Sequence, residues 1–279
     1  MEGQNMSYKR KSLQELNLND DFLFGKVMND ISIVHEFLEY LLNMEIKEIE
    51  MVNTQEVISP QYGSRGVRLD VYVKDVYNNK YNIEIQNTDR GNIPTRMRFY
   101  QSAMDVQSLD KSEDYSNLGN DYIIFICPFD LFHKGYSRYD FEYICELNSL
   151  NLKLNDGIHK IVLNANGENK NVDKNISDFL NYLCSSNQET ANNSCDFVQK
   201  IHRKVLEIKS NKELEVEFLS VQEKFYENFK DGKKEGREEG HDEFYKIMKY
   251  LKSGKSEEEI LKIMGDDCKS VIEKAKTLL

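Results

Sequence analysis

Hydrophobic and polar residues alternate with a period of two across residues 67–88. The stretch Val67–Lys74 alternates first, Asn78–Asn79 gives a turn signal, and Tyr81–Thr88 alternates again. Successive side chains of a strand point to opposite faces, so each alternating stretch predicts a half-buried strand. Two such strands joined by a short turn predict an antiparallel hairpin.

Helices and further strands are predicted on both sides of this hairpin. Asn19–Asp21 offers helix N-caps, and apolar residues at helical spacing then predict one helix that ends near Asn43. The continuous apolar run in Asp121–Pro128 predicts a central strand that is covered on both faces. The other elements predicted here are a helix at Pro94–Leu109, a strand at Glu50–Ile58 followed by a turn at Ser59–Pro60, and strands at Tyr139–Leu147 and Gly157–Asn164.

The character of the chain changes after about Gly167, where helical patterns replace strand patterns. The charged segment Lys230–Glu243 predicts a solvated, frayed helix or a linker. Acidic residues near the end of the chain favour packing or homo-oligomerisation through these helices over DNA binding. The predicted helices are Asp173–Leu183, Asp196–Ile208, a coiled-coil-like stripe from Leu214 to Phe225, Phe244–Leu251, Ser256–Met264 with a capping box, and a last one beyond Gly265.

Composition and charge favour a folded, acidic protein. Hydrophobic residues make up 39% of the chain, which is enough for a core, and the net charge is −11. Any nucleic-acid contact must therefore come from a local basic patch or from bound cations. The five cysteines show no C-x-x-C spacing and are expected to be reduced, with Cys127 and Cys145 buried in apolar strands. No signal peptide and no membrane-spanning run is expected, so we expect a cytoplasmic protein.

Three polar residues of the hairpin have the chemistry of a metal site. Asp70 lies in the first strand, while Glu84 and Gln86 lie two apart in the second and so share a face. Mg²⁺ prefers a few carboxylate oxygens and retained waters, and it can drive phosphodiester hydrolysis. An Asp and a Glu on neighbouring strands are also common on the solvated face of a sheet, so the pattern alone leaves both interpretations open.

Together with its surroundings, the hairpin resembles the Rpn-type recombination-promoting nucleases, also called PD-(D/E)XK nuclease family transposases. The core of the resemblance is Arg68–Tyr72 followed by Tyr81–Gln86. It covers about residues 13–165, with a looser likeness in the charged tail. The segments that extend it are Asp21–Lys26, Thr95–Gln101, Tyr122–Asp130 and the Gly-Arg-Glu-Glu-Gly run at residues 236–240.

The resemblance implies an α/β fold with a restriction-endonuclease-like core, in which helices flank a mixed sheet. It implies that Asp70 and Glu84 bind Mg²⁺, or Mn²⁺, with help from the backbone carbonyl of Ile85. The namesake motif ends in Lys, whereas this chain has Gln86, which can orient water but adds no charge. We expect Arg96 or Arg98 to supply a positive charge near a phosphate instead.

Further residues are candidates for the same site. Asp21 matches an early Asp of the family and is predicted either to act at the site or to cap a helix. Glu36 and Glu39 lie on the same predicted helix and are weaker candidates. Tyr100 and Gln101 are expected to line the cleft beside the two arginines, with Tyr100 alternatively a packing residue.

The predicted organisation is a nuclease-like domain at residues 13–165 and a helical, charged extension at residues 166–279. The predicted function is Mg²⁺-dependent endonucleolytic cleavage of DNA, in DNA mobility, recombination or defence. A second hypothesis is a catalytically inactive nuclease-fold protein that serves as a binding or assembly module. The acidic charge and Gln86 favour the second hypothesis, and the Asp70/Glu84 pair favours the enzyme.

Overall fold

The computed structural model describes residues 11–58, 66–109, 111–147 and 149–277, so the turn predicted at Ser59–Pro60 lies outside the described residues. The chain divides into two compact units, one spanning Lys11–Glu215 and the other beginning at Val216. Among the described residues, no helix combines the length and the hydrophobicity that crossing a bilayer requires.

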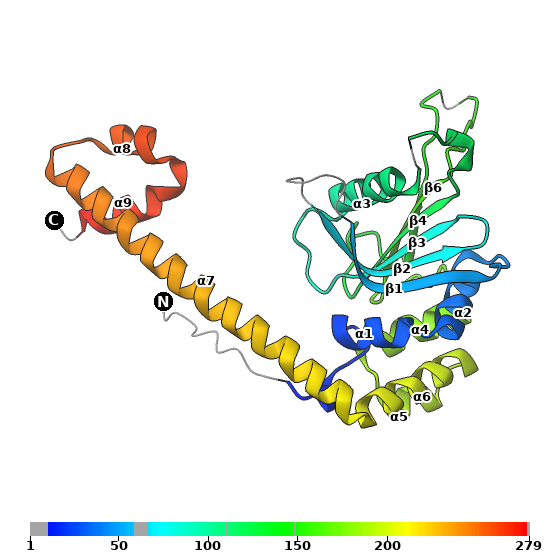
Figure 1. The fold of residues 1–279 in the computed structure, drawn as a ribbon. Coiled ribbons are helices and arrows are strands. Elements are labelled where there is room, and N and C mark those ends of the chain that lie inside the picture. Colours follow the sequence, from blue (N-terminus) through cyan, green and yellow to red (C-terminus); the bar gives the residue numbers. More distant parts are fainter. Residues whose placement is uncertain (1–10, 59–65, 110, 148, 278–279) are drawn as a thin grey trace. The chain divides into compact units, whose positions relative to one another are not determined.

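The first unit is built on a mixed sheet, which has six strands in the described part of the chain (Figure 1). Their order is β1-β2-β3-β4-β6-β5, with parallel pairing of β3 with β4 and of β4 with β6, and antiparallel pairing elsewhere. The strands are β1 (Ile49–Ile58), β2 (Val67–Asp75), β3 (Lys80–Ile85), β4 (Asp121–Cys127), β5 (Arg138–Phe141) and β6 (Ile158–Asn164).

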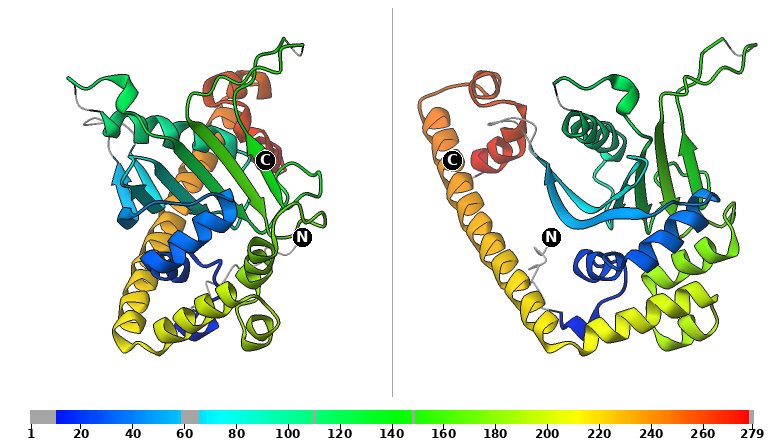
Figure 2. Two further views of the ribbon diagram at one scale, coloured as in Figure 1. Left: turned by 90° about the vertical axis from the view of Figure 1, so that its right-hand side faces the viewer. Right: turned by 45° about the vertical axis from the view of Figure 1, so that its right-hand side comes forward.

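Helices cover both faces of this sheet, as Figures 1 and 2 show. Helix α3 (Ile93–Ser108) lies on one face, and α1, α2, α4, α5 and α6 lie on the other. This arrangement confirms the predicted fold class, a mixed α/β core with flanking helices and a helical C-terminal part. The helices of the second face are α1 (Asp21–Met28), α2 (Ile31–Leu42), α4 (Lys174–Cys184), α5 (Gln188–Asn192) and α6 (Asp196–Ser210), and short 3-10 turns lie at Leu13–Glu15 and Tyr115–Asn117.

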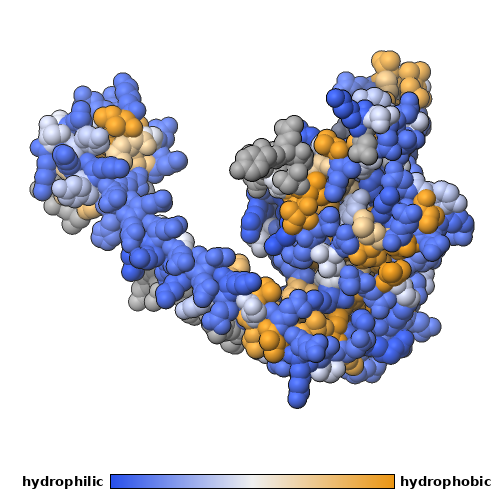
Figure 3. All heavy atoms as spheres, in the orientation of Figure 1, coloured by the Kyte–Doolittle hydropathy of each residue, from blue (hydrophilic) through white to orange (hydrophobic). Residues whose placement is uncertain are grey.

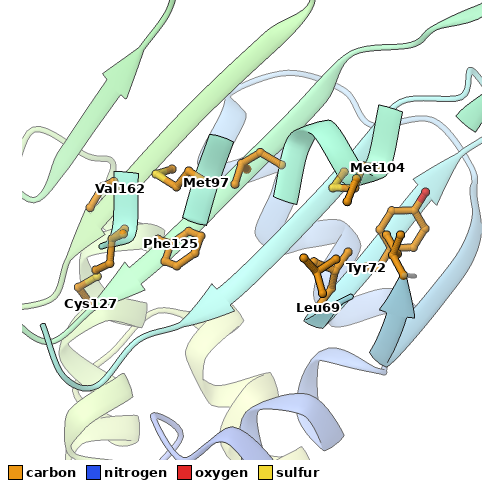
Figure 4. Close-up of a cluster of buried hydrophobic side chains, with 12 residues drawn as sticks. Leu69, Tyr72, Met97, Met104, Phe125, Cys127 and Val162 are labelled. Atoms are coloured by element: carbon orange, nitrogen blue, oxygen red, sulfur yellow. The ribbon is translucent and has the colours of Figure 1, made fainter. Parts of the chain in front are cut away.

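The core between α3 and the sheet positions the functional residues. Leu69 and Phe125 of the sheet are fully buried, and Met97 and Met104 of α3 pack against the same cluster (Figure 4). Because burial of these side chains fixes α3 over β3 and β4, the polar residues that α3 carries at Arg96 and Tyr100 are held above the hairpin.

The hairpin prediction is confirmed, with one correction. β2 and β3 pair antiparallel, with Val71 opposite Ile83. All six residues of β3 are buried, including Glu84 at 1% exposure, so the interpretation as a solvated face is wrong. The physical reason is that α3 covers the polar face of the strand, an arrangement that alternation within the hairpin does not reveal. The strand also ends at Ile85, before the predicted end at Thr88.

Two further element predictions are wrong in detail, and so is the predicted burial of Cys145. The single helix expected up to Asn43 is two helices, because the side chain of Asp30 accepts a hydrogen bond from Ser32 N at 3.1 Å and starts a new helix. The strand expected at Tyr139–Leu147 ends at Phe141, and Cys145 is only half-buried, outside the named strands. The described Cys127 is a buried free thiol, as expected.

The second unit is helical. Helix α7 (Lys212–Lys252) runs through the boundary between the units, so Lys230–Glu243 is a solvated helix and the linker alternative is wrong. The predicted short helices α8 (Glu257–Met264) and α9 (Lys269–Lys276) are confirmed, with a 3-10 turn at Asp266–Cys268 between them and the capping box at Ser256 in place. Ile247, Ile260 and Ile272 form their buried centre.

Candidate active site

Asp70 and Glu84 meet at the end of the hairpin, where the main-chain ladder of β2 and β3 stops. The amide N–H of Asp70 donates to Oε1 of Glu84 at 3.0 Å, and the amide N–H of Ile85 donates to Oδ2 of Asp70 at 3.3 Å. Each carboxylate therefore accepts a bond from the opposite strand. The two acids line the same cleft.

Both carboxyl groups are held in an environment that disfavours their charge. Burial raises the pKa of Glu84 well above its usual range, and the negative charge of Asp70 adds to this. Burial likewise raises the pKa of Asp70, with a further contribution from the charge of Asp21. Three acids crowded into a partly dry cleft require compensation by positive charge, and perturbed acids of this kind cluster at functional sites.

Arg96 of α3 supplies part of that positive charge. Its Nη2 lies 3.2 Å from Oε2 of Glu84 and donates to the hydroxyl of Tyr100 at 2.9 Å, while Nη1 donates to Oε1 of Gln86. The guanidinium also lies 5.2 Å from the ring centres of both Tyr100 and Phe125. Arg96 and Tyr100 can act together because residues four apart lie on one face of a helix.

Asp21 lines the same cleft. The N-cap of α1 is the preceding residue, Asp20. Asp20 accepts a hydrogen bond from Phe22 N at 3.1 Å, so the interpretation of Asp21 as the helix cap is wrong. Burial raises the pKa of Asp21, the charge of Asp20 raises it further, and Arg68 lowers it. Asp21 is thereby placed among the acids of the cleft rather than at a structural turn.

Most of the predicted site residues come together, and some do not. Gln101 is buried and donates its side-chain amide to Asp105, so it does not line the cleft. Glu36 pairs with Lys200, and Glu39 accepts from Ile46 N, both away from it. The cleft has a volume of about 870 Å³ and includes the predicted residues Asp21, Asp70, Glu84, Ile85, Gln86, Arg96, Arg98 and Tyr100.

The sequence interpretation missed two arginines of this cleft, Arg68 and Arg90. Arg68 lies two residues before Asp70, so the period of the strand could have placed both on one face. With Arg96 and Arg98 they give four guanidinium groups along the cleft of an otherwise acidic protein. They lie beside the three acids of the cleft, Asp21, Asp70 and Glu84, and one of them, Arg96, is paired with Glu84.

The donor set suits a hard divalent cation of the Mg²⁺ type. Among the described residues, no group of three or more His, Cys, Asp or Glu is arranged as a ready metal cage. Mg²⁺ does not need such a cage, because one or two carboxylates, other oxygen ligands and retained waters satisfy it. The crowded carboxyls of Asp70 and Glu84, whose pKa values are raised, fit that requirement.

Comparison with known proteins adds one finding. The family model described as PD-(D/E)XK nuclease family transposase matches residues 21–207, which is about two thirds of the chain. Comparisons with curated proteins and with solved structures found no match. The matched span begins at Asp21, ends within α6, and contains the whole cleft.

Proposed function

The chain belongs to the PD-(D/E)XK nuclease family transposases, and from that premise we propose that it is a divalent-metal-dependent DNA endonuclease that acts in DNA mobility, recombination or defence. The observation that carries this proposal is the pair of Asp70 and Glu84, which converge in a cleft lined by four arginines. Two buried acids beside a basic track suit phosphodiester chemistry.

In this proposal Asp70 and Glu84 hold a Mg²⁺ or Mn²⁺ ion, together with the carbonyl oxygen of Ile85. The bound ion would lower the pKa of a coordinated water and neutralise charge that develops on the phosphate. Asp21 lies close enough for its charge to act on the carboxyl of Asp70, and so adds to the negative field that attracts the ion. Other residues of the chain then have to position the substrate and to supply further positive charge near its phosphate.

Gln86 and Arg96 together take the place of the Lys in the family motif. The amide of Gln86 donates to Thr88 O at 2.6 Å, while its oxygen accepts from Arg96. The amide oxygen has a second lone pair, which can still orient a water molecule. Gln86 therefore holds a guanidinium near the place where the motif would put an ammonium, and the positive charge of the site comes from α3.

Arg68, Arg90 and Arg98 are proposed to contact the DNA backbone. All three line the cleft, and guanidinium groups bind phosphate oxygens in a bidentate manner. The overall charge of −11 repels DNA elsewhere, so this track should determine where the duplex docks. We further propose that the protein works in the cytoplasm.

One observation supports the second candidate, an inactive binding protein. Arg96 already forms an ion pair with Glu84 at 3.2 Å, and this contact engages a carboxylate that a metal needs. If the pair is permanent, the fold would bind DNA or a partner without cleaving it. Calorimetric titration with Mg²⁺ and Mn²⁺ separates the two functions. The nuclease must bind a metal ion through Glu84, whereas the binding protein has no such requirement.

The direct test is nicking of a supercoiled plasmid with Mg²⁺ or Mn²⁺. Asp70→Asn and Glu84→Gln keep the shape of each side chain and should abolish nicking and metal binding. Glu168→Gln removes an exposed carboxylate outside the cleft and should change neither. Equal nicking by all four proteins would reject the enzyme, and metal-independent DNA binding without nicking would support the binding protein.

A further inference from the structure

A two-stranded arm, described at residues 142–147 and 149–155, projects from the edge of the sheet. It leaves β5, the last strand in the sheet order, and returns towards β6 (Figures 1 and 2). Within it, Cys145 N donates to Leu152 O at 2.8 Å and Leu154 N donates to Tyr143 O at 2.9 Å. These bonds flank a bridge between Ile144 and Lys153 and fix the register of the arm.

This register sorts the side chains of the arm by polarity. Cross-strand partners share a face, so Ile144 and Lys153 lie on one side. Glu142 forms an ion pair with Lys153 and belongs to that same side. The next pairs along the ladder face the other side and are apolar throughout; they are Tyr143 with Leu154 and Cys145 with Leu152. We call these four residues the apolar arm face.

The apolar arm face and the tip of the arm are largely exposed in the single chain. Tyr143, Leu152 and Leu154 are exposed at 49–66%, and Leu147 and Leu150 near the tip fall in the same range. Figure 3 shows hydrophobic atoms gathered at the end of the arm. An isolated two-stranded hairpin is marginally stable in water, and exposed apolar patches of this kind mark interaction sites. The arm therefore needs a surface that covers this face.

We propose that the apolar arm face docks against the same face of a second copy of this chain, and that the protein is a two-fold dimer. The charged residues Glu142 and Lys153 lie on the opposite face, so their charges stay outside the contact when two arms stack. One ammonium borders the apolar arm face, because Nζ of Lys160 lies 5.1 Å from the centre of the Tyr143 ring. A single cation is too little to hold an anionic lipid surface or nucleic acid against a net charge of −11.

The available area is of the right size for a dimer. Five large hydrophobic residues expose about half to two thirds of their surface on each arm. With roughly 200 Å² for a fully exposed residue of this size, each copy offers on the order of 600 Å². A standard stable interface buries about 800 Å² per partner, so contacts at the arm edges would complete it. Association through the arm differs from association through the C-terminal helices, which the sequence suggested.

Sedimentation velocity and equilibrium of the full-length chain test this dimer. The wild-type protein should sediment as a dimer at micromolar concentration. Leu154→Lys should weaken the dimer by at least roughly tenfold, the loss that a central interface side chain commonly causes. Ile144→Lys is the matched control, because Ile144 is equally exposed at 66% on the opposite face of the same arm. It should leave the dimerisation constant within about twofold.

A second measurement uses the half-buried thiol of Cys145 on the apolar arm face. A bifunctional maleimide should cross-link the wild-type protein to a dimer, and Cys145→Ser should prevent this. A wild-type protein that remains monomeric at about 100 µM would overturn the proposal, since standard interfaces bind more tightly than that. An unchanged dimerisation constant in Leu154→Lys, or cross-linking that persists in Cys145→Ser, would also overturn it, and would assign self-association to another surface such as the C-terminal helices.

Discussion

Asp70 and Glu84 each accept a hydrogen bond from the main chain of the other strand, at 3.3 and 3.0 Å. This exchange holds the two acids together at the end of a buried hairpin. Burial raises both pKa values, and the charge of Asp70 adds to the effect at Glu84 while that of Asp21 adds to the effect at Asp70. Without a cation the arrangement costs the fold free energy, because the charged carboxyls are better solvated in the unfolded chain. The metal-free protein should therefore be less stable than a variant in which one of these carboxyl groups is replaced by an uncharged side chain.

We predict that Glu84→Gln stabilises the metal-free protein at neutral pH. The folded pKa of Glu84 is raised above its usual 4.5, so the folded state binds the proton more tightly than the unfolded state. The free energy of unfolding of the wild-type protein therefore falls as the pH rises from about 4.5 through the raised pKa of Glu84. The Gln variant has no proton to lose at this position, so it avoids that fall. We expect a gain of about 1–3 kcal/mol at pH 7.5, reduced by the lost ion pair with Arg96.

Denaturant unfolding in EDTA at several pH values measures this gain. The advantage of the Gln variant should shrink as the pH falls towards the usual pKa of a Glu. Glu168→Gln provides the control, since that residue is exposed and should show no advantage at any pH. A Glu84→Gln protein that is less stable than wild type at pH 7.5 would show that the carboxylate is satisfied without a metal.

Metal affinity should increase with pH. Both carboxyls must lose their protons to bind a cation, and their pKa values are raised to about 6 for Asp70 and about 8 for Glu84. Between pH 6 and 8, where Glu84 still carries its proton and Asp70 has lost its own, apparent affinity for Mn²⁺ should therefore rise by up to about tenfold per unit, and it should level off above about pH 8. Calorimetry in buffers of different ionisation enthalpy should detect released protons, and a flat profile between pH 6 and 8 contradicts the assignment.

The short-range part of this site could be predicted from the sequence. The alternation in Val67–Lys74 and the following strand, joined by a tight turn, fixes the register of the hairpin locally. That register pairs Val71 with Ile83 and so brings the neighbouring residues Asp70 and Glu84 together at the end of the hairpin. The family resemblance was also confirmed, because it rests on the order of several motifs along the chain.

The long-range part could not be predicted. The burial of Glu84 and its contact with Arg96 depend on how α3 packs over the sheet, which no local pattern encodes. The break at Asp30 was missed because apolar spacing continues through it, while the side chain of Asp30 accepts a hydrogen bond from Ser32 N and so starts a second helix. The charge pattern of Lys230–Glu243 left a helix and a linker both open, and charged pairs such as Lys234 with Glu238 support the helix.

Gln86 and Arg96 should behave as a coupled pair in cleavage. Gln86→Lys restores the residue of the family motif but removes the acceptor of Arg96 and places two cations together. We expect this single change to lower nicking by about tenfold or more, despite the better match to the motif. Gln86→Lys combined with Arg96→Gln should recover much of that loss.

A double-mutant cycle on the nicking rate measures this coupling. The interaction energy should be about 1–2 kcal/mol, and the double variant should nick faster than the sum of the two single effects predicts. Arg96→Lys is a useful companion, because it keeps the charge but loses the planar contacts to Gln86 and Tyr100. Additive effects would mean that Arg96 acts independently of Gln86.

The last prediction concerns the buried ion pair beneath α3, between Lys80 and Asp121. The two residues are partners in the parallel pairing of β3 with β4, and Nζ of Lys80 lies 2.9 Å from Oδ1 of Asp121. Lys80 also donates to Ser108 Oγ at 2.6 Å. Asp121→Ala removes the ion-pair partner of this buried ammonium, so we expect a loss of about 3–5 kcal/mol.

The reverse change should cost less and should depend on pH. Burial raises the pKa of Asp121 to about 7, so in Lys80→Met the acid can protonate and avoid an uncompensated charge. Its loss of stability should therefore be smaller at pH 6 than at pH 8, as urea unfolding would show. Lys80→Met combined with Asp121→Leu should lie close to wild type, because apolar residues of similar volume often replace buried pairs without loss. A double variant as unstable as Asp121→Ala would mean that the pair, rather than its packing, holds β3 against β4.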